Sequence, residues 1–473
     1  MKRRSFSLIQ LSCLIGLTLL LSACNLGTAQ SDAYVTMVPR ATATPPPTLG
    51  VESGGQLQQP DLTLGGVQTP VVDPSVEIKN LLNQVDPERM RAHIQYLQNV
   101  QTRHILSSQT GATGIGAAQR YIEEQFRLIS DSSGGNLTVP TPHAFTAYNT
   151  ATQSATNYNV FAYIQGSETN AGIYVIGAHY DSVGPNLKDP TIAAPGANDN
   201  GSGVAGMLEI ARILSQRRYR ATLIFVAFSA EEHERQGSKA FVNDIILGSG
   251  MDVLGMINID SIGNADDNSG NIDDHELSVY SDDSNSSQSR QMARMAEMIS
   301  DYYGLDMRLE VETSRDREGR YGDHFSFSDA GVPAIRFINT LEQWPNASAN
   351  DLIQYIEFDY LTRATQSIMM FVLTVADGPR LPRCDIVLRP VQNDTQTLIW
   401  NPLEDATGYM VFFRLADSLH YDGYVETLES RLAAQSNLFS QYGAITVAAR
   451  GRNGIIGPFC DEYLVGQQFV ASP

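Results

Sequence analysis

Apolar residues change their spacing along the chain, and these changes predict where helices and strands lie. From Val76 onward, apolar positions recur every three or four residues, which predicts two helices separated near Pro87 and a third helix at about 115–129. Continuous apolar runs then predict buried strands at 158–164, 172–176, 222–228, 255–259, 277–280 and 334–337. Helical spacing returns at 204–214, 289–303 and 361–375. Strands that alternate with helices predict an α/β fold with a mostly parallel mixed sheet flanked by helices.

The pattern changes after Pro379, where short strand-like runs alternate with turn residues. These runs occupy 385–388, 397–400, 409–415 and 444–449, and they predict an all-β domain over 380–473 behind an α/β domain over 76–378. Trp400 and the run at 409–413 resemble the B and C strands of a fibronectin type III sandwich. The resemblance implies a C-terminal β-sandwich that serves spacing or adhesion, or only stability.

The first 23 residues have the pattern of an export signal. Basic residues at 2–4 precede a mostly apolar run at 8–21, which is too short and too early for a comfortable transmembrane helix. The run ends in Leu21-Ser22-Ala23-Cys24, which resembles the bacterial lipoprotein cleavage box. The resemblance implies cleavage before Cys24, a lipid on its sulfur, and attachment outside the cytoplasm to the bacterial cell membrane. Ordinary signal cleavage is the alternative. Residues 24–75, rich in Pro, Thr and Gly, predict a disordered tether.

Composition and charge narrow the classes of function. The chain has 473 residues, 42% of them hydrophobic, and a formal net charge of −20. This length exceeds one typical domain, and an acidic surface argues against nucleic-acid binding, which needs basic stripes. Cys13 leaves with the signal peptide and Cys24 carries the lipid, so Cys384 and Cys460 are the cysteines that remain. In an oxidising compartment these two are predicted to form a disulfide.

Candidate metal ligands stand where predicted strands pass into loops. His179 follows an apolar run, and Asp181 lies two residues later on the same side of an extended segment, where its carboxylate could orient the imidazole. Asp199 lies between two asparagines on a Gly-rich turn. Its carboxylate could contact two cations at once, or it could be an ordinary helix N-cap.

Three more acids and a histidine occupy similar positions. Glu231 and Glu232 follow a predicted strand, and two acids there need a partner such as a cation unless they form a surface turn. Asp260 ends another apolar run, and His324 lies on a later loop. Each residue alone has a structural explanation, but together they indicate a site for metal ions with nitrogen and oxygen ligands.

The order and spacing of these residues resemble the zinc aminopeptidase family of co-catalytic two-zinc exopeptidases, which includes bacterial secreted leucyl-type aminopeptidases. The resemblance covers residues 76–378. It implies two Zn²⁺ ions, one held by His179 and Asp260, the other held by Glu232 and His324, with Asp199 bridging them. It also implies a non-proline cis peptide bond between Asp199 and Asn200.

The resemblance further implies the reaction. Glu231 would be the general base, Asp181 would orient His179, and the substrates would be peptides with a free N-terminus. Nothing in the sequence points to a nucleic-acid partner. Three alternatives remain at this stage: a carboxypeptidase of the same fold, a glutaminyl cyclase, or a non-catalytic adhesion lipoprotein that has kept the fold.

Overall fold

The computed structural model describes residues 75–267, 269–317, 319–341, 346–381, 384–435 and 438–466. The predicted signal peptide, Cys24 and the predicted tether up to residue 74 lie outside the described residues. Within the described ranges, no helix has the length and apolar character needed to cross a membrane.

Three helices open the described chain, as the apolar spacing predicts. They are α2 (Val76–Leu82), α3 (Pro87–Asn99) and α4 (Ile115–Ser132). Helix α3 begins at Pro87 because proline fits the first helical position, and the Asp86 carboxylate accepts hydrogen bonds from the first free backbone N–H groups. Pro87 therefore separates α2 from α3.

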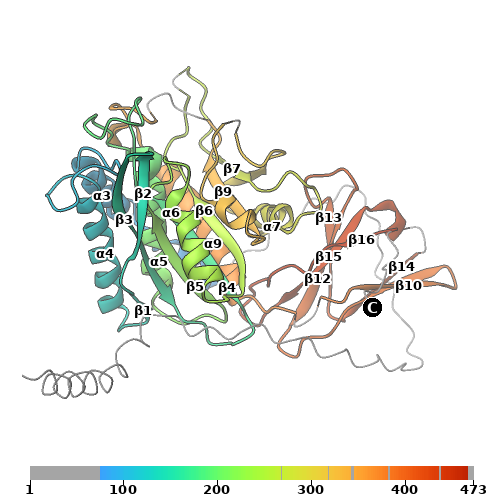
Figure 1. Cartoon of the computed structure of the whole chain (residues 1–473). Helices are drawn as coiled ribbons and strands as arrows, with labels where there is room; N and C mark the ends of the chain where they lie inside the picture. Colours follow the sequence, from blue (N-terminus) through green and yellow to red (C-terminus); the bar gives the residue numbers. More distant parts are fainter. Residues whose placement is uncertain are drawn as a thin grey trace, which may run out of the picture. The chain divides into compact units, whose positions relative to one another are not determined.

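A mixed sheet forms the centre of the α/β domain (Figure 1). Its strands are β1 (Leu137–Thr138), β2 (His143–Thr150), β3 (Gln153–Ile164), β4 (Ile173–His179), β5 (Thr222–Phe228), β6 (Val253–Ile259), β7 (Glu276–Tyr280), β8 (Arg308–Val311) and β9 (Ala334–Asn339). The spatial order is β1-β3-β5-β4-β6-β9-β7-β8, with β2 paired to β3. The central pairs β5–β4, β4–β6 and β6–β9 are parallel, whereas β3–β5 and β7–β9 are antiparallel. The predicted fold class is confirmed.

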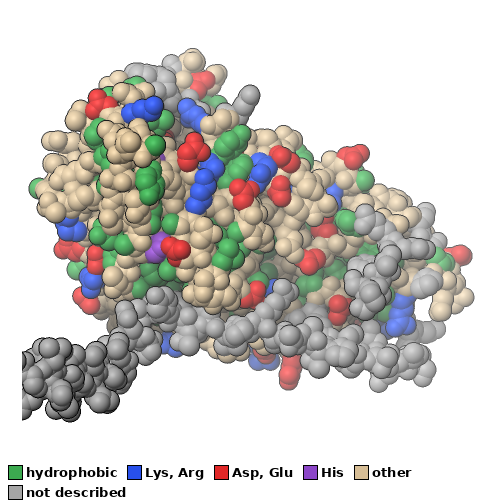
Figure 2. Space-filling view, viewed as in Figure 1, with side chains coloured by type: hydrophobic (Ala, Val, Ile, Leu, Met, Phe, Trp, Pro, Cys, Tyr) green, Lys and Arg blue, Asp and Glu red, His purple; other side chains and the backbone are tan. Residues whose placement is uncertain are grey.

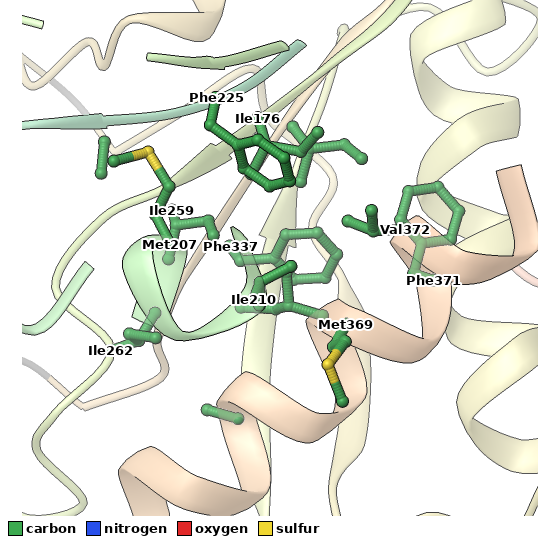
Figure 3. Packing of buried hydrophobic residues seen from close by; sticks show 14 of the residues in the cluster. Ile176, Met207, Ile210, Phe225, Ile259, Ile262, Phe337, Met369, Phe371 and Val372 are labelled. Atoms are coloured by element: carbon green, nitrogen blue, oxygen red, sulfur yellow. The ribbon is translucent and has the colours of Figure 1, made fainter. Parts of the chain in front are cut away.

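Helices cover both faces of this sheet. On one face lie α5 (Gly203–Leu214), α7 (Gln288–Tyr302) and α9 (Phe358–Asp377); α6 (Gln236–Phe241) and α8 (His324–Ser328) contact the other side of the strands. Figure 3 shows part of this core: Met207 and Ile210 of α5 and Met369 of α9 belong to the same buried cluster as Phe225 and Phe337 on the strands. Burying large apolar side chains is the main favourable term in folding, so this layer fixes the sheet that carries the candidate site.

The C-terminal region is all-β, as predicted. A three-stranded antiparallel sheet contains β10 (Val387–Gln392), β11 (Thr395–Ile399) and β14 (Arg431–Gln435). A four-stranded one contains β12 (Gly408–Arg414), β13 (Gly423–Thr427), β15 (Ala444–Arg450) and β16 (Tyr463–Leu464). Buried residues of both sheets, including Leu398 and Val411, share one hydrophobic cluster. The predicted disulfide between Cys384 and Cys460 is present, and the likeness to a fibronectin type III domain stays a prediction.

Candidate metal centre

Three neighbouring parallel strands end at the same edge of the sheet. His179 is the last residue of β4 and pairs with Phe228, the last residue of β5. Strand β6 ends at Ile259 on the other side of β4, so Asp260 follows it directly. Since the carboxyl ends of adjacent parallel strands meet, the loops that follow them bring their side chains together.

Three of the predicted ligands lie within reach of one cation. His179, Asp199 and Asp260 each offer one ligand atom, and these atoms all lie within 4.8 Å of one another. His179 Nε2 is 3.3 Å from Asp199 Oδ1 and 3.3 Å from Asp260 Oδ1. Both His179 and Asp260 are buried. Glu231 Oε2 stands slightly farther away, 4.0 Å from the same imidazole nitrogen.

The loop that carries Asp199 is tied to the end of β6. The peptide bond between Asp199 and Asn200 is cis, as the family resemblance implies. Asn200 Oδ1 accepts hydrogen bonds from Gly203 N at 3.0 Å and Ser261 N at 2.9 Å, and its Nδ2 donates to Ile259 O at 2.9 Å. Asn200, and not Asp199, thus meets the first backbone N–H of α5, so the N-cap alternative for Asp199 is wrong.

Gly203 allows this loop to lie close to the strand. A Cβ at that position would stand 2.3 Å from Asn200 Oδ1 and 2.4 Å from Ile259 O. No side chain fits there without moving backbone, so the glycine is required by the close approach of the loop to β6.

Asp181 supports two parts of the site. Its carbonyl oxygen is 3.2 Å from His179 Nδ1, and its carboxylate oxygen Oδ1 is 3.6 Å from the same nitrogen. The carboxylate also accepts hydrogen bonds from Glu231 N at 3.0 Å and Glu232 N at 3.2 Å. The imidazole is therefore oriented chiefly by the backbone of Asp181, while the carboxylate holds the Glu231–Glu232 turn.

Two buried charged residues that were not predicted hold the ligand loops. Asp351 accepts hydrogen bonds from Asn198 N at 2.8 Å and Asp199 N at 2.9 Å. The fully buried guanidinium of Arg103 donates to the carbonyls of Tyr180 and Gly196, one on each ligand loop. Burial raises the pKa of Asp351 to about 7 and lowers the pKa of Arg103 to about 10. The sequence could not predict this role, because an isolated Asp or Arg in a polar segment gives no indication that its side chain is buried.

His324 presents one ring nitrogen to the protein and leaves the other available. Nε2 lies 3.1 Å from Arg315 O and 3.7 Å from Asp316 Oδ2. Nδ1 is buried and has no hydrogen-bond partner among the residues that the structure describes. Burial lowers the pKa of His324 to about 4, which keeps the ring neutral and able to act as a ligand.

Residues 159–372 match the family model described as Peptidase family M28. A protein of Pyricularia oryzae with the name "Probable zinc metalloprotease" is 31% identical over 362 residues, which cover 69% of this chain and 70% of that protein. The chain belongs to peptidase family M28. A protein of the same name in Phaeosphaeria nodorum is 28% identical to this M28 peptidase over 75% of the chain and 80% of its own length.

Solved structures share the fold of this M28 peptidase at low identity. The LapA aminopeptidase of Legionella pneumophila is 18% identical, with a TM-score of 0.51 over 64% of this chain and 75% of that chain. LapB of the same organism is 18% identical, with a TM-score of 0.51 over 65% of this chain and 77% of that chain. These likenesses show that the chains share a fold.

The donor set of the M28 peptidase fits metal cations. Burial raises the pKa of Glu231 and Glu232 well above the usual range, and neighbouring carboxylates raise both further. Oε1 of Glu232 is buried and, within the described part of the chain, has no hydrogen-bond partner. Buried acids are costly unless cations neutralise them. Among the described residues, Glu232 and His324 are not part of the close group around His179.

The acidic character of the surface differs from that of the site. Acidic side chains are spread over the face of the molecule in Figure 2, with basic side chains among them. Of the carboxylates beside His179, by contrast, those of Asp181 and Asp260 are buried and those of Asp199 and Glu231 are only partly exposed.

Proposed function

We propose that this M28 peptidase is a two-zinc aminopeptidase. The single observation that carries the proposal is the close approach of His179, Asp199 and Asp260 at the carboxyl ends of parallel strands. The names of the Pyricularia and Phaeosphaeria relatives support zinc, and the name of the Legionella LapA structure supports release of N-terminal residues.

In this proposal the ligands divide between two ions. His179 and Asp260 would hold one zinc, Glu232 and His324 would hold the other, and Asp199 would be shared between them. Bound zinc supplies a Lewis acid and lowers the pKa of a coordinated water toward about 7. Nitrogen and oxygen ligands without thiolates are typical of catalytic zinc sites.

Glu231 is proposed to move the proton. Its backbone N–H is held by Asp181, and its Oε2 stands 4.0 Å from His179 Nε2, beside the ligands without a hydrogen bond to them. From there the carboxylate can take a proton from the attacking water and return it to the leaving amine.

The experiment measures release of p-nitroaniline from leucyl-p-nitroanilide and from its N-acetylated form. We expect turnover of the free-amine substrate only, loss of turnover with a chelator, and recovery when zinc is restored. Glu231→Gln should lower kcat by a factor of about 10² to 10⁴ with unchanged zinc content. Glu234→Gln is the matched control, because Glu234 is exposed on the same turn.

Two results would contradict the proposal. If the Glu231→Gln and Glu234→Gln proteins were equally active, Glu231 would not be the general base. Hydrolysis of a blocked substrate from its C-terminus, with no action on leucyl-p-nitroanilide, would identify a carboxypeptidase instead.

We also propose that the protein is a lipoprotein held outside the cytoplasm through Cys24. The basis is the sequence Leu21-Ser22-Ala23-Cys24 at the end of the apolar run. Labelled palmitate should enter the wild-type protein in a bacterial host and should not enter a Cys24→Ala variant. Labelling of both proteins, or of neither, would contradict the anchor.

A further inference from the structure

Arg336 links two carboxylates next to the metal centre. It lies on β9, paired with Asn258 of β6 on one side and Tyr280 of β7 on the other. Its Nη2 is 3.1 Å from Asp260 Oδ2, and its Nη1 donates to Asp316 Oδ1 at 2.9 Å and Oδ2 at 2.8 Å. All three side chains are buried. A buried arginine between two carboxylates is a strong and geometrically defined contact.

The two oxygens of Asp260 have different surroundings. Oδ1 faces His179 Nε2 at 3.3 Å and lies 3.4 Å from Ser261 Oγ. Oδ2 forms an ion pair with Arg336, whose Nη2 lies 3.1 Å away. One oxygen of the proposed ligand is thus available to a cation, and the other is occupied by a fixed positive charge.

The second carboxylate connects Arg336 to His324. Asp316 Oδ2 lies 3.7 Å from His324 Nε2 and accepts a hydrogen bond from Gly322 N at 3.1 Å. A Cβ on Gly322 would stand 3.1 Å from Arg336 Cδ, so backbone packs directly against the arginine. The guanidinium can therefore turn little, and it holds both Asp260 and, through Asp316, the backbone just before His324.

We infer that Arg336 is a positioning residue that holds Asp260 as a single-oxygen ligand and, through the hydrogen bond between Asp316 and Gly322 N, holds the turn that precedes His324. This inference rests on the proposed metal site. Without Arg336, Oδ2 of Asp260 loses its partner and the carboxylate can rotate. The cation would then meet a less ordered ligand, or both oxygens in place of one.

The test uses Co²⁺ as the probe in the purified full-length protein, because its visible absorption reports ligand number. Arg336→Gln should bind Co²⁺ about 10- to 100-fold more weakly, in competition with a chelating indicator, and should show weaker absorption per bound ion. Arg336→Lys keeps the charge and should recover part of both properties. Arg431→Gln is the matched control, since Arg431 pairs with Glu429 at an exposed position away from the centre.

Asp316→Asn is the second variant, because it conserves shape while it weakens the anchor of Arg336. We expect it to weaken Co²⁺ binding in the same direction, even if Arg336→Gln does not fold. Wild-type affinity and spectrum in a folded Arg336→Gln protein, or in Asp316→Asn, would overturn the inference while the proposed peptidase stands. A wild-type protein that binds no Co²⁺ would overturn both.

Discussion

Replacing Arg103 by methionine tests whether one buried cation holds the ligand loops in place. The guanidinium donates to four backbone carbonyls, those of Leu97, Tyr180, Pro195 and Gly196. Methionine has similar length but no donor, so the variant leaves these carbonyls without their charged partner. The Arg103 backbone N–H keeps its own hydrogen bond, because that bond does not involve the side chain.

The expected cost follows from these contacts. A hydrogen bond to a charged group contributes about 1.5 to 3 kcal/mol, and removing one member of a buried charged network costs about 3 to 5 kcal/mol. Burial lowers the pKa of Arg103 to about 10, which shows that the charge itself is costly to bury and offsets part of the gain. We therefore expect a loss of about 4 kcal/mol in the free energy of unfolding.

Urea denaturation of the metal-free wild-type and variant proteins measures this loss. Arg120→Met is the matched control: Arg120 also donates to two backbone carbonyls, but at an exposed position where water can replace it. The control should change stability by less than about 1 kcal/mol. An Arg103→Met protein as stable as the Arg120→Met protein would refute the reasoning.

Three further predictions concern pH, covalent cross-linking and metal. Burial lowers the pKa of His93, which lies 2.8 Å from Tyr121 Oη, to about 4. The unfolded chain takes up a proton below about pH 6.5 and the folded chain does not, so stability falls by about 2 kcal/mol from pH 7 to pH 4.5. In urea titrations, the His93→Gln protein should lose about 2 kcal/mol less stability between pH 7 and pH 4.5 than the wild-type protein does. An equal loss in both proteins would contradict this prediction. Replacing both Cys384 and Cys460, which are 76 residues apart, by serine should lower the free energy of unfolding by about 4 kcal/mol, because the unfolded chain gains loop entropy. A loss below about 1 kcal/mol in urea denaturation would contradict this prediction. When free zinc is kept at 100 times its Kd, removing it should lower the free energy of unfolding by about 3 kcal/mol. A thermal midpoint that stays unchanged when a chelator is added would exclude tight zinc binding to the folded state.

The parts of the fold that could be predicted from the sequence are those whose apolar pattern is strong. The run at 222–228 coincides with β5, because a strand covered on both faces is apolar throughout. Strand β2 was missed because most of its side chains are at least partly exposed and its pattern is largely polar. Strand β8 and helix α6 were missed because both are short and receive their stability from packing against longer neighbours.

The candidate site could be predicted only as far as its ligands follow strands. His179 and Asp260 stand at strand ends, where the sequence marks a change from apolar to polar residues. Arg103 and Asp351 reach the same place from loops far away in the chain, and no local pattern reports that. Arg336 did leave a signal: a charged residue inside the apolar run at 334–337 needs a buried partner.

The position of β9 has a consequence for how the protein is made. This strand fills the gap between β6 and β7, yet it is the last strand of the large sheet to leave the ribosome. A nascent chain that ends before Ala334 leaves β6 and β7 with open edges that invite aggregation. Such a chain also lacks Arg336, so neither the sheet nor the surroundings of Asp260 are complete until β9 has been added.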